Sequence, residues 1–230
     1  MSTTNTVVNP TFGDNLKRLL QWMWGQEVRT PIPAAPSSGP LLRRSNALRE
    51  FCRAVQTPPG LQILDLGSAS QANISFITGM GHKLYTEDLF RTLVKVESGR
   101  AGGAEPVVDE ERFFRENLDY PEAHFDGILC WDLLDFLSDP LVGPLVERLH
   151  RLSKPGGNLL TFFRTSPLSE PVPLYQYRIR SEDTLQITGC GTSKMRRHFT
   201  NRTIENLFRP FASLRFYLAR DNLREVIIVR

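Results

Sequence analysis

Short apolar runs alternate along much of the chain with segments whose apolar residues have helical spacing. The run at residues 61–66 contains Asp65, and it is followed by Gly67 and then by apolar residues at helical spacing, Ile74, Ile77 and Met80. This order predicts a buried strand, a tight turn and a helix. Because such a turn presents backbone N–H groups at a helix N-terminus, it is suited to polar or anionic ligand groups. Gly67 lacks a Cβ and so allows close approach to the backbone.

Further strands and helices are expected along the same part of the chain. The composition favours strands at residues 83–87, 112–115, 125–130 and 158–163. Helices are expected at residues 89–96 and around Leu145, Leu149 and Leu152, and a glycine-rich loop at residues 98–106. Strands that alternate with helices imply a parallel sheet with helices on both of its faces.

The two ends of the chain follow different patterns. At the C-terminus, a helix at residues 201–208 precedes two apolar runs, 214–218 and 226–229, which are joined by a short turn and predict an antiparallel hairpin. At the N-terminus, residues 1–44 are expected to form an extension of a main domain that spans residues 45–230.

The N-terminal extension is expected to contain one helix and a linker. Apolar residues fall on one helical face behind a cap at Asp14, namely Leu16, Leu19, Leu20, Met23 and Trp24. This helix either packs on the edge of the domain or covers a ligand site. Residues 30–40 are rich in Pro, Ser and Gly and read as a linker, and a second helix is expected to begin near Ser45.

Composition narrows the class of protein. The 230 residues are 40% hydrophobic and 23% charged with a formal net charge of +3, so the charge does not by itself demand a nucleic acid or a membrane. The three cysteines are far apart and give no metal-binding spacing and no disulfide framework. No apolar run is long enough to span a bilayer, and the first residues lack a signal-peptide pattern. We therefore expect a cytoplasmic protein with no metal and no membrane partner.

Acidic residues mark the edge of the predicted sheet at which a ligand would bind. In open parallel sheets, ligands bind beyond the carboxyl ends of the strands, at the point where the strand order reverses. An acid after the second strand, Glu87 or Asp88, suits a ribose because a carboxylate accepts hydrogen bonds from both hydroxyls. Alternatively, the two acids cap the helix that follows them.

Four motifs follow one another along the chain: Asp65-Leu66-Gly67, Glu87-Asp88-Leu89, the run from Phe125 to Cys130, and Lys154-Pro155-Gly156-Gly157. In this order they resemble the motifs of class I S-adenosylmethionine-dependent methyltransferases. The Lys-Pro-Gly-Gly turn is the most specific of the four, and the final hairpin agrees with the reversed seventh strand of that family. The resemblance implies a Rossmann-like, doubly wound α/β fold with a mostly parallel seven-stranded sheet.

The resemblance also implies S-adenosylmethionine as cofactor and assigns contacts to it by position. On the methionine side, the implied contacts are Asp65 and Gly67, with Ser68, Ala69 and Ser70 in the turn around the methionine portion. Glu87 or Asp88 would contact the ribose, with Leu89 beside them, and Asn117 and Leu118 would lie near the adenine. Cys130, Trp131 and Asp132 would face the sulfonium and the acceptor. The implied function is methyl transfer, a transferase activity of the EC 2.1.1 type, to an unidentified small-molecule or macromolecular acceptor.

The first motif departs from the family's pattern. Ala69 and Gln71 stand where further glycines are common, and Phe114 stands near the position of an acid often found after the third strand. A non-catalytic member of the fold that acts as a binding or scaffold protein is therefore an alternative. A nicotinamide-dependent oxidoreductase is a second one, against which stand the missing Gly-x-Gly-x-x-Gly and the terminal hairpin.

Residues on the acceptor side have two interpretations each. Asp132 is a candidate general base or acceptor anchor, and alternatively the N-cap of a helix at residues 133–137. Trp131 either stacks on a ligand ring or belongs to the core. Residues 165–198 combine basic and aromatic residues that could cover the acceptor and grip an anionic or nucleic-acid substrate, but a solvated hairpin is favoured there.

Overall fold

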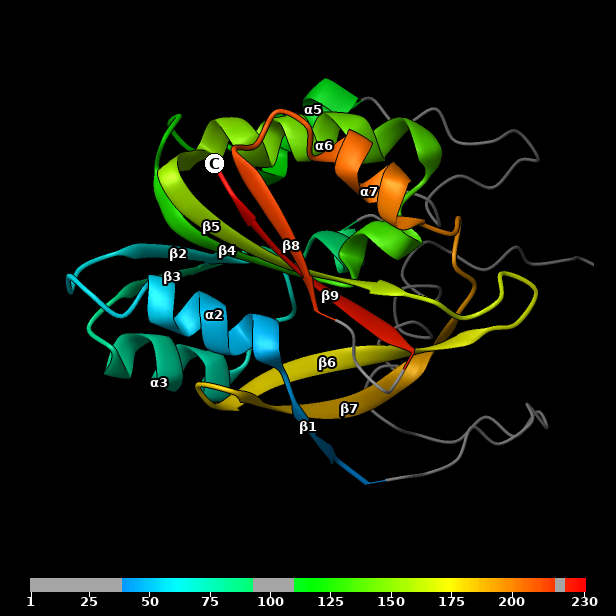
Figure 1. The fold of residues 1–230 in the computed structure, drawn as a ribbon, viewed down its shortest axis with the longest axis horizontal. Coiled ribbons are helices and arrows are strands. Elements are labelled where there is room, and N and C mark those ends of the chain that lie inside the picture. The colour runs from blue at the N-terminus through cyan, green and yellow to red at the C-terminus, as the bar shows by residue number, and fades with distance from the viewer. Residues whose placement is uncertain (1–38, 93–109, 218–221) are drawn as a thin grey trace, which may run out of the picture. The chain divides into compact units, whose positions relative to one another are not determined.

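A computed structural model describes residues 39–92, 110–217 and 222–230 (Figure 1). The chain divides into two units, Met1–Ser37 and Ser38–Arg230, and the description below concerns the second. The predicted N-terminal helix, most of the linker and the glycine-rich loop at residues 98–106 lie outside the described residues. Of the helix predicted at residues 89–96, residues 89–92 are described and are helical.

A six-stranded sheet with the order β3-β2-β4-β5-β9-β8 forms the centre of this unit. Its strands are β2 (Gln62–Asp65), β3 (Lys83–Thr86), β4 (Phe125–Trp131), β5 (Ser153–Arg164), β8 (Ser213–Tyr217) and β9 (Leu223–Val229). The strands β3, β2, β4 and β5 pair in parallel, whereas β9 runs antiparallel to both of its neighbours. The doubly wound fold and the terminal hairpin are confirmed, and the sheet has six strands among the described residues rather than seven.

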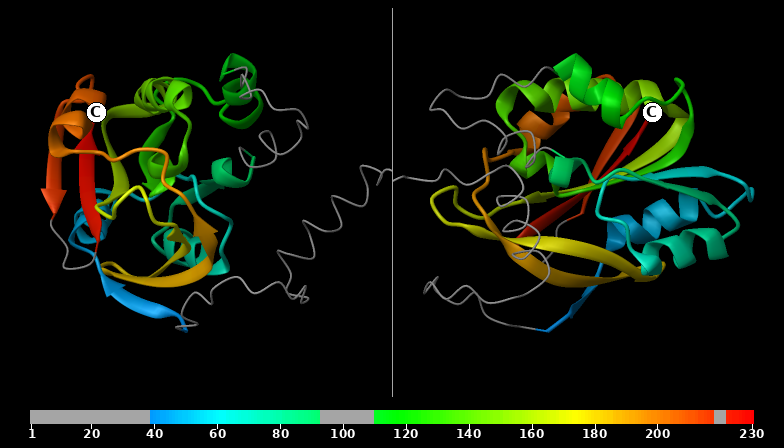
Figure 2. Two further views of the ribbon diagram at one scale, coloured as in Figure 1. Left: turned by 90° about the vertical axis from the view of Figure 1, so that its right-hand side faces the viewer. Right: turned by 180° about the vertical axis from the view of Figure 1, so that it is seen from behind.

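Helices cover both faces of this sheet (Figures 1 and 2). One face carries α2 (Asn46–Ala54) and α3 (Gln71–Gly79), and the other carries α5 (Glu110–Asn117), α6 (Asp139–Leu152) and α7 (Asn201–Leu207). Each layer encloses its own buried apolar cluster, so Phe51 and Ile77 pack on one side and Leu145 and Phe208 on the other. The two-sided coverage predicted from the alternating pattern is confirmed.

The strand predicted at residues 112–115 is wrong, because this segment lies within the helix α5. Phe113, Phe114 and Leu118 are all buried and pack into the core beside α6. Phe114 and Leu118 are four positions apart and so fall on one side of a helix, and the intervening Arg and Glu residues are good helix formers. The four residues 112–115 were too few to show this helical spacing, because two adjacent phenylalanines also fit a strand.

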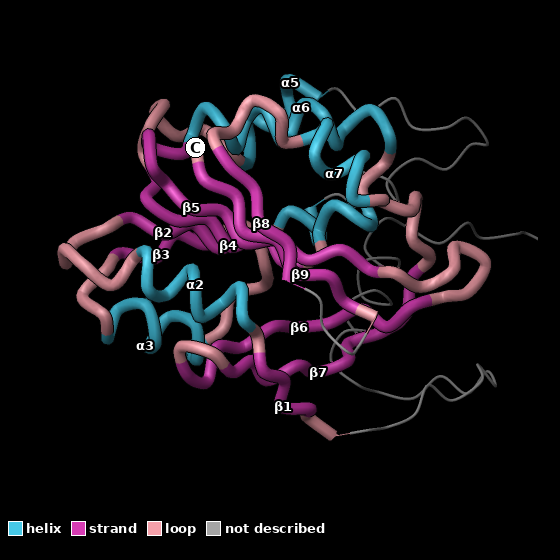
Figure 3. Tube along the Cα trace, viewed as in Figure 1, coloured by secondary structure: helices cyan, strands magenta, loops and turns pink. Residues whose placement is uncertain are grey.

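A second sheet, with the order β1-β7-β6, lies beside α2 and α3 (Figure 3). It consists of β1 (Leu41–Arg44), β7 (Thr184–Ser193) and β6 (Val172–Ser181), and all pairs are antiparallel. The predicted hairpin is therefore present, but one of its faces is buried: Tyr177, Ile179, Leu185 and Ile187 pack into the same cluster as α2. The strand β1 was not predicted, since residues 41–44 were assigned to the extension.

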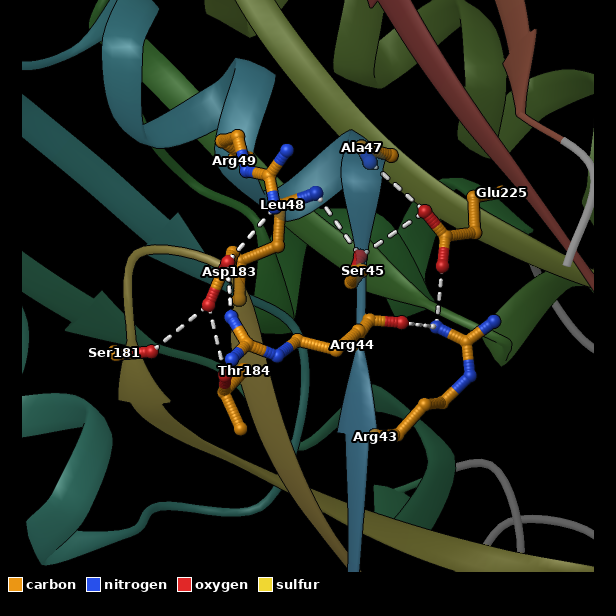
Figure 4. Close-up of polar contacts among 10 residues, drawn as sticks. All are labelled: Arg43, Arg44, Ser45, Ala47, Leu48, Arg49, Ser181, Asp183, Thr184 and Glu225. Carbon is orange, nitrogen blue, oxygen red and sulfur yellow. Dashed lines mark hydrogen bonds and ion pairs between the residues drawn. The ribbon is translucent and has the colours of Figure 1, made fainter.

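Two acidic residues connect β1 and α2 to the two sheets (Figure 4). Glu225 of β9 is 2% exposed and accepts hydrogen bonds from the Arg43 guanidinium, from Ser45 Oγ at 3.1 Å and from the backbone N–H of Ala47 at 2.8 Å. Ser45 in turn caps α2, because its Oγ accepts a hydrogen bond from Leu48 N at 3.0 Å. The negative charge of Glu225 thus lies at the positive end of a helix.

The second of these residues is Asp183, in the turn between β6 and β7. It contacts the guanidinium groups of Arg44 and Arg49, and it accepts hydrogen bonds from the hydroxyls of Ser181 and Thr184 (Figure 4). These donors, Arg49 first, hold the pKa of Asp183 below its usual value. The hairpin β6–β7 is therefore fixed to the start of α2, which in turn positions the face that it presents to the six-stranded sheet.

Candidate functional site

A pocket of about 160 Å³ lies at the carboxyl ends of β2 and β4. Its lining comes from three loops at the strand ends and from the hairpin: residues 66–70 after β2, Asp88 and Phe90 after β3, residues 130–133 and Phe136 at and beyond the end of β4, residues 174–178 of β6, and Cys190 of β7. The position is the one expected for the ligand of a doubly wound sheet. The hairpin β6–β7 forms the wall opposite the strand ends.

The turn after β2 leads into α3, as the sequence predicted. Ser70 is the N-cap of α3, and its Oγ accepts a hydrogen bond from Asn73 N at 3.2 Å. Ser68 and Ala69 line the pocket between the strand and the helix. Gly67 is required here by close packing, because a Cβ built on it would lie 2.9 Å from Cδ1 and Nε1 of Trp131. The space beside this glycine is occupied by the indole.

Asp65 is buried behind that indole and is 1% exposed. Its carboxylate accepts hydrogen bonds from Trp131 Nε1 at 2.6 Å, Asn73 Nδ2 at 2.8 Å and Gly67 N at 2.9 Å. Burial raises the pKa of Asp65 above its usual value, while these three donors oppose the rise and the charge of Asp88 adds to it. In this arrangement Asp65 organises the turn and is not among the residues that line the pocket.

Trp131 has an unusual backbone conformation, with φ at +53°. The pairing of β4 with β5 shifts register between Leu129 and Trp131, and this irregularity turns the indole toward Gly67. The ring stacks on Tyr177, with centroids 5.1 Å apart and an interplanar angle of 4°. Trp131 therefore belongs to the buried cluster beside α2, as the core interpretation expected, and it also lines the pocket; its stacking on a ligand ring stays a prediction.

The two acids after β3 point in different directions. Asp88 lines the pocket, where its Oδ2 accepts a hydrogen bond from Ser68 Oγ at 2.6 Å. Its Oδ1 accepts one from Arg91 N at 3.0 Å, so Asp88 also caps the helical turn that follows. Glu87 instead accepts a hydrogen bond from the hydroxyl of Tyr120 and does not line the pocket.

Four other predicted contacts are placed away from the pocket or within the core. Leu89 and Leu118 are buried in the cluster beside α6, and Asn117 donates to the backbone carbonyl of Phe113 at 2.7 Å. Cys130 borders the pocket, but its side chain is fully buried, and burial raises the pKa of its thiol to about 12. The structure thus brings together Gly67, Ser68, Ala69, Ser70, Asp88, Cys130, Trp131 and Asp132, and it does not bring Asp65, Glu87, Leu89, Asn117 or Leu118 into the lining.

Asp132 forms a buried ion pair with Arg164 at the end of β5, with 2.7 Å between Oδ2 and Nη2. A short 3₁₀ helix, Leu133–Phe136, follows Asp132, and the Asp132 side chain makes no capping hydrogen bond to it. Asp132 therefore occupies the N-cap position of this short helix, but its carboxylate pairs with Arg164 and does not cap the helix. The guanidinium of Arg164 also lies 4.7 Å from the ring centroid of Tyr175 and donates to the carbonyl of Pro173 at 2.7 Å.

Sequence reasoning missed Arg164 and did not single out Tyr177. The Tyr177 hydroxyl is buried next to the carboxylate of Asp132. Burial, and next the charge of Asp132, raise its pKa well above the usual value. The position of Arg164 could have indicated its role. A charged residue directly after an apolar strand lies at the same carboxyl edge of the sheet as the acids of the site.

Two properties of the described residues complete the picture of the site. Within residues 39–92, 110–217 and 222–230, no group of three or more His, Cys, Asp or Glu side chains is arranged to hold a metal ion. No helix in these ranges is both long and apolar enough to cross a bilayer.

Comparison with known proteins gives one family match and several similar structures. A family model described as a methyltransferase domain matches residues 41–211. No curated protein matches the chain. A SAM-dependent methyltransferase from Archaeoglobus fulgidus has a TM-score of 0.50 at 10% identity, over 80% of this chain and 91% of that one, and this likeness supports the fold.

Two further structures are similar at lower scores. One is the 1,6-didemethyltoxoflavin-N1-methyltransferase of Burkholderia thailandensis with bound 1,6-didemethyltoxoflavin and S-adenosylhomocysteine, with a TM-score of 0.43, 17% identity and coverage of 80% and 75%. The other is an S-adenosylmethionine-dependent methyltransferase from Mesorhizobium loti, with a TM-score of 0.45, 16% identity and coverage of 80% and 96%. Because the matched family model spans most of the chain, this protein belongs to the family of methyltransferase domains, which transfer a methyl group from S-adenosylmethionine.

Proposed function

We propose that this protein binds S-adenosylmethionine at the turn after β2 and transfers its methyl group to an acceptor held against the hairpin β6–β7. One observation carries the proposal: a single pocket joins the turn residues, Asp88 and residues 130–132 on one side to residues 174–178 of β6 on the other. A donor and an acceptor can therefore be placed face to face. The acceptor itself is left open, as a small molecule or as one group of a larger one.

The residues of the turn and Asp88 fit a ribose-bearing cofactor. The carboxylate of Asp88 is held by the exposed hydroxyl of Ser68, which a ribose hydroxyl can replace as the donor. The backbone of residues 67–70 precedes the N-terminus of α3, where polar ligand groups are favoured. The methionine portion belongs beside Gly67 and Asp65. When bound, the cofactor supplies a methyl group on a positively charged sulfur.

The protein's own contribution is to align the acceptor and to receive its proton. Proximity and orientation supply much of the acceleration for a donor that already carries a good leaving group. Arg164 holds one oxygen of Asp132, so the other oxygen can accept a hydrogen bond or a proton from an acceptor hydroxyl or amine. The hydroxyl of Tyr177 lies next to Asp132 in the same lining, where it can donate to this carboxylate or to the acceptor group. Asp132 is thus proposed as base or anchor.

Calorimetric titration with S-adenosylhomocysteine tests the proposed cofactor site. Replacing Asp88 by Ala is expected to weaken binding by about 1–3 kcal/mol, because the ribose hydroxyls lose a charged acceptor. Glu87→Ala is expected to have a smaller effect, since Glu87 faces Tyr120. Asp119→Ala serves as the matched control, because Asp119 is an exposed acid outside the pocket lining. Equal affinities of the Asp88 and Asp119 variants would contradict the assignment of the ribose site.

A further inference from the structure

The indole of Trp131 occupies the recess beside Gly67. Its Cδ1 and Nε1 atoms lie 2.9 Å from the point where a Cβ on Gly67 would be, so the close approach that this glycine permits is already taken by a side chain of the same protein. The proposed function places the methionine portion of the cofactor beside this residue. The indole and the methionine portion therefore compete for one recess.

The indole also uses the hydrogen-bonding capacity of Asp65. Its Nε1–H donates to Asp65 Oδ1 at 2.6 Å, and Trp131 lines the pocket whereas Asp65 does not. The indole thus separates the carboxylate from the pocket. An ammonium group is a donor of the same kind as an indole N–H, with the addition of a positive charge that a carboxylate favours. Trp131 therefore stands in for the amino end of a ligand at Asp65.

Two more observations point to an arrangement that can change. Trp131 is held at φ +53°, a region that bulky residues rarely adopt, and such strain is concentrated at active sites, ligand clamps and switch regions. The pocket measures about 160 Å³, whereas pockets for ligands of this size usually span about 300–1,000 Å³. Moving one indole out of the recess enlarges the pocket on the side that Gly67 opens.

We propose that Trp131 is an internal competitor for the cofactor. In the closed arrangement, its indole fills the recess beside Gly67, donates to Asp65 and stacks on Tyr177. Entry of the cofactor moves the indole aside, and the cofactor's ammonium replaces the indole N–H at Asp65. Because only the open arrangement binds the cofactor, the apparent affinity is the intrinsic affinity multiplied by the fraction of molecules in the open arrangement. This inference rests on the proposed function, because it requires the methionine portion to lie beside Gly67.

Affinity measurements give the first test. Shortening Trp131 strengthens cofactor binding if the indole competes with the cofactor, and weakens it if the indole contacts the bound cofactor. Trp131→Phe removes the donor to Asp65 and shortens the ring, so S-adenosylhomocysteine is expected to bind about fivefold more tightly, which is about 1 kcal/mol. Tyr217→Phe is the matched control, since it removes a hydroxyl that donates to Glu50 at 2.8 Å, outside the pocket. Its affinity is expected to equal that of the original protein. Weaker binding by Trp131→Phe would overturn the inference.

NMR of the indole N–H groups gives a second readout that does not depend on activity. The chain has three tryptophans, and the resonance of Trp131 is the one that disappears in Trp131→Phe. Adding S-adenosylhomocysteine is expected to shift this resonance, because the hydrogen bond to Asp65 is lost. Binding that leaves the resonance unmoved would overturn the inference while leaving the proposed function intact. No binding by either protein would contradict both, whereas binding by Trp131→Phe alone would support the competitor.

Discussion

At the scale of single residues, two acids at the carboxyl edge of the sheet are each held by a residue from another strand, Asp65 by Trp131 and Asp132 by Arg164. Asp65, Asp88 and Asp132 were all expected at the carboxyl edge of the sheet, and the structure places each of them there. Their partners come from elsewhere along the chain: Trp131 contacts Asp65, and Arg164 contacts Asp132. No local pattern reports such pairs, because packing of separate strands creates them. Hence Asp65 was predicted to touch the cofactor, whereas the structure buries it behind the indole.

Asp135 provides a prediction on the pH dependence of stability. Burial raises its pKa well above the usual value, and the nearby charge of Asp132 adds to this, although hydrogen bonding from Arg164 N and the charges of Arg164 and Arg224 oppose it. A carboxyl group that binds its proton more tightly in the folded state stabilises the fold at low pH. This contribution is lost as the pH rises from the usual value through the raised one.

Asp135→Asn is therefore expected to gain stability relative to the original protein as the pH rises from about 4 to 7. The variant keeps an oxygen that can accept the hydrogen bond from Arg164 N but carries no titratable group. Urea unfolding at several pH values measures the difference in free energy of unfolding between the variant and the original protein. Asp65, whose pKa is also raised, contributes equally to both proteins, so its contribution cancels in this difference. A difference that stays constant over this range would show that Asp135 does not titrate as described.

At the scale of elements, regular spacing predicted most strands and helices correctly. β2, β3, β4, α3, α6 and α7 all appear near the predicted residues. The two failures have physical causes: α5 contains adjacent phenylalanines that also fit a strand, and β1 is an edge strand with exposed Leu41 and Leu42. An edge strand of four residues shows little alternation of apolar and polar residues. It is stabilised by its backbone pairing with β7, which no local sequence pattern indicates.

The attachment of β1 and α2 to the core through Glu225 leads to a prediction at this scale. Glu225→Ala removes the acceptor for Arg43, Ser45 and Ala47 N, and it is expected to lower the free energy of unfolding by about 3 kcal/mol, as for other buried ion pairs. Hydrogen exchange at the β7 amides that pair with β1 is expected to become faster. Glu50→Ala is the matched control, because its pair with Arg215 is exposed and contributes far less. Equal losses in the two variants would contradict the anchoring role.

At the scale of the whole described unit, the family resemblance anticipated the topology better than periodicity did. The reversed strand β9 between β5 and β8 follows from the resemblance, since apolar runs alone give no strand order. The second sheet was not anticipated, because its inner face becomes buried only against α2 and α3. This sheet is what turns the open edge of strand ends into a pocket with two walls, so the acceptor side was the part of the site that the sequence described least.

A crystal structure of the protein with S-adenosylhomocysteine tests the central claim most directly. The claim is that the cofactor lies at the carboxyl ends of β2, β3 and β4, where the pocket is formed. The predicted result is a ribose within hydrogen-bond distance of Asp88 and a methionine portion beside Gly67, with the sulfur facing Asp132 and the hairpin β6–β7. A ligand bound elsewhere on the protein, or a ribose that contacts Glu87 in place of Asp88, would contradict it.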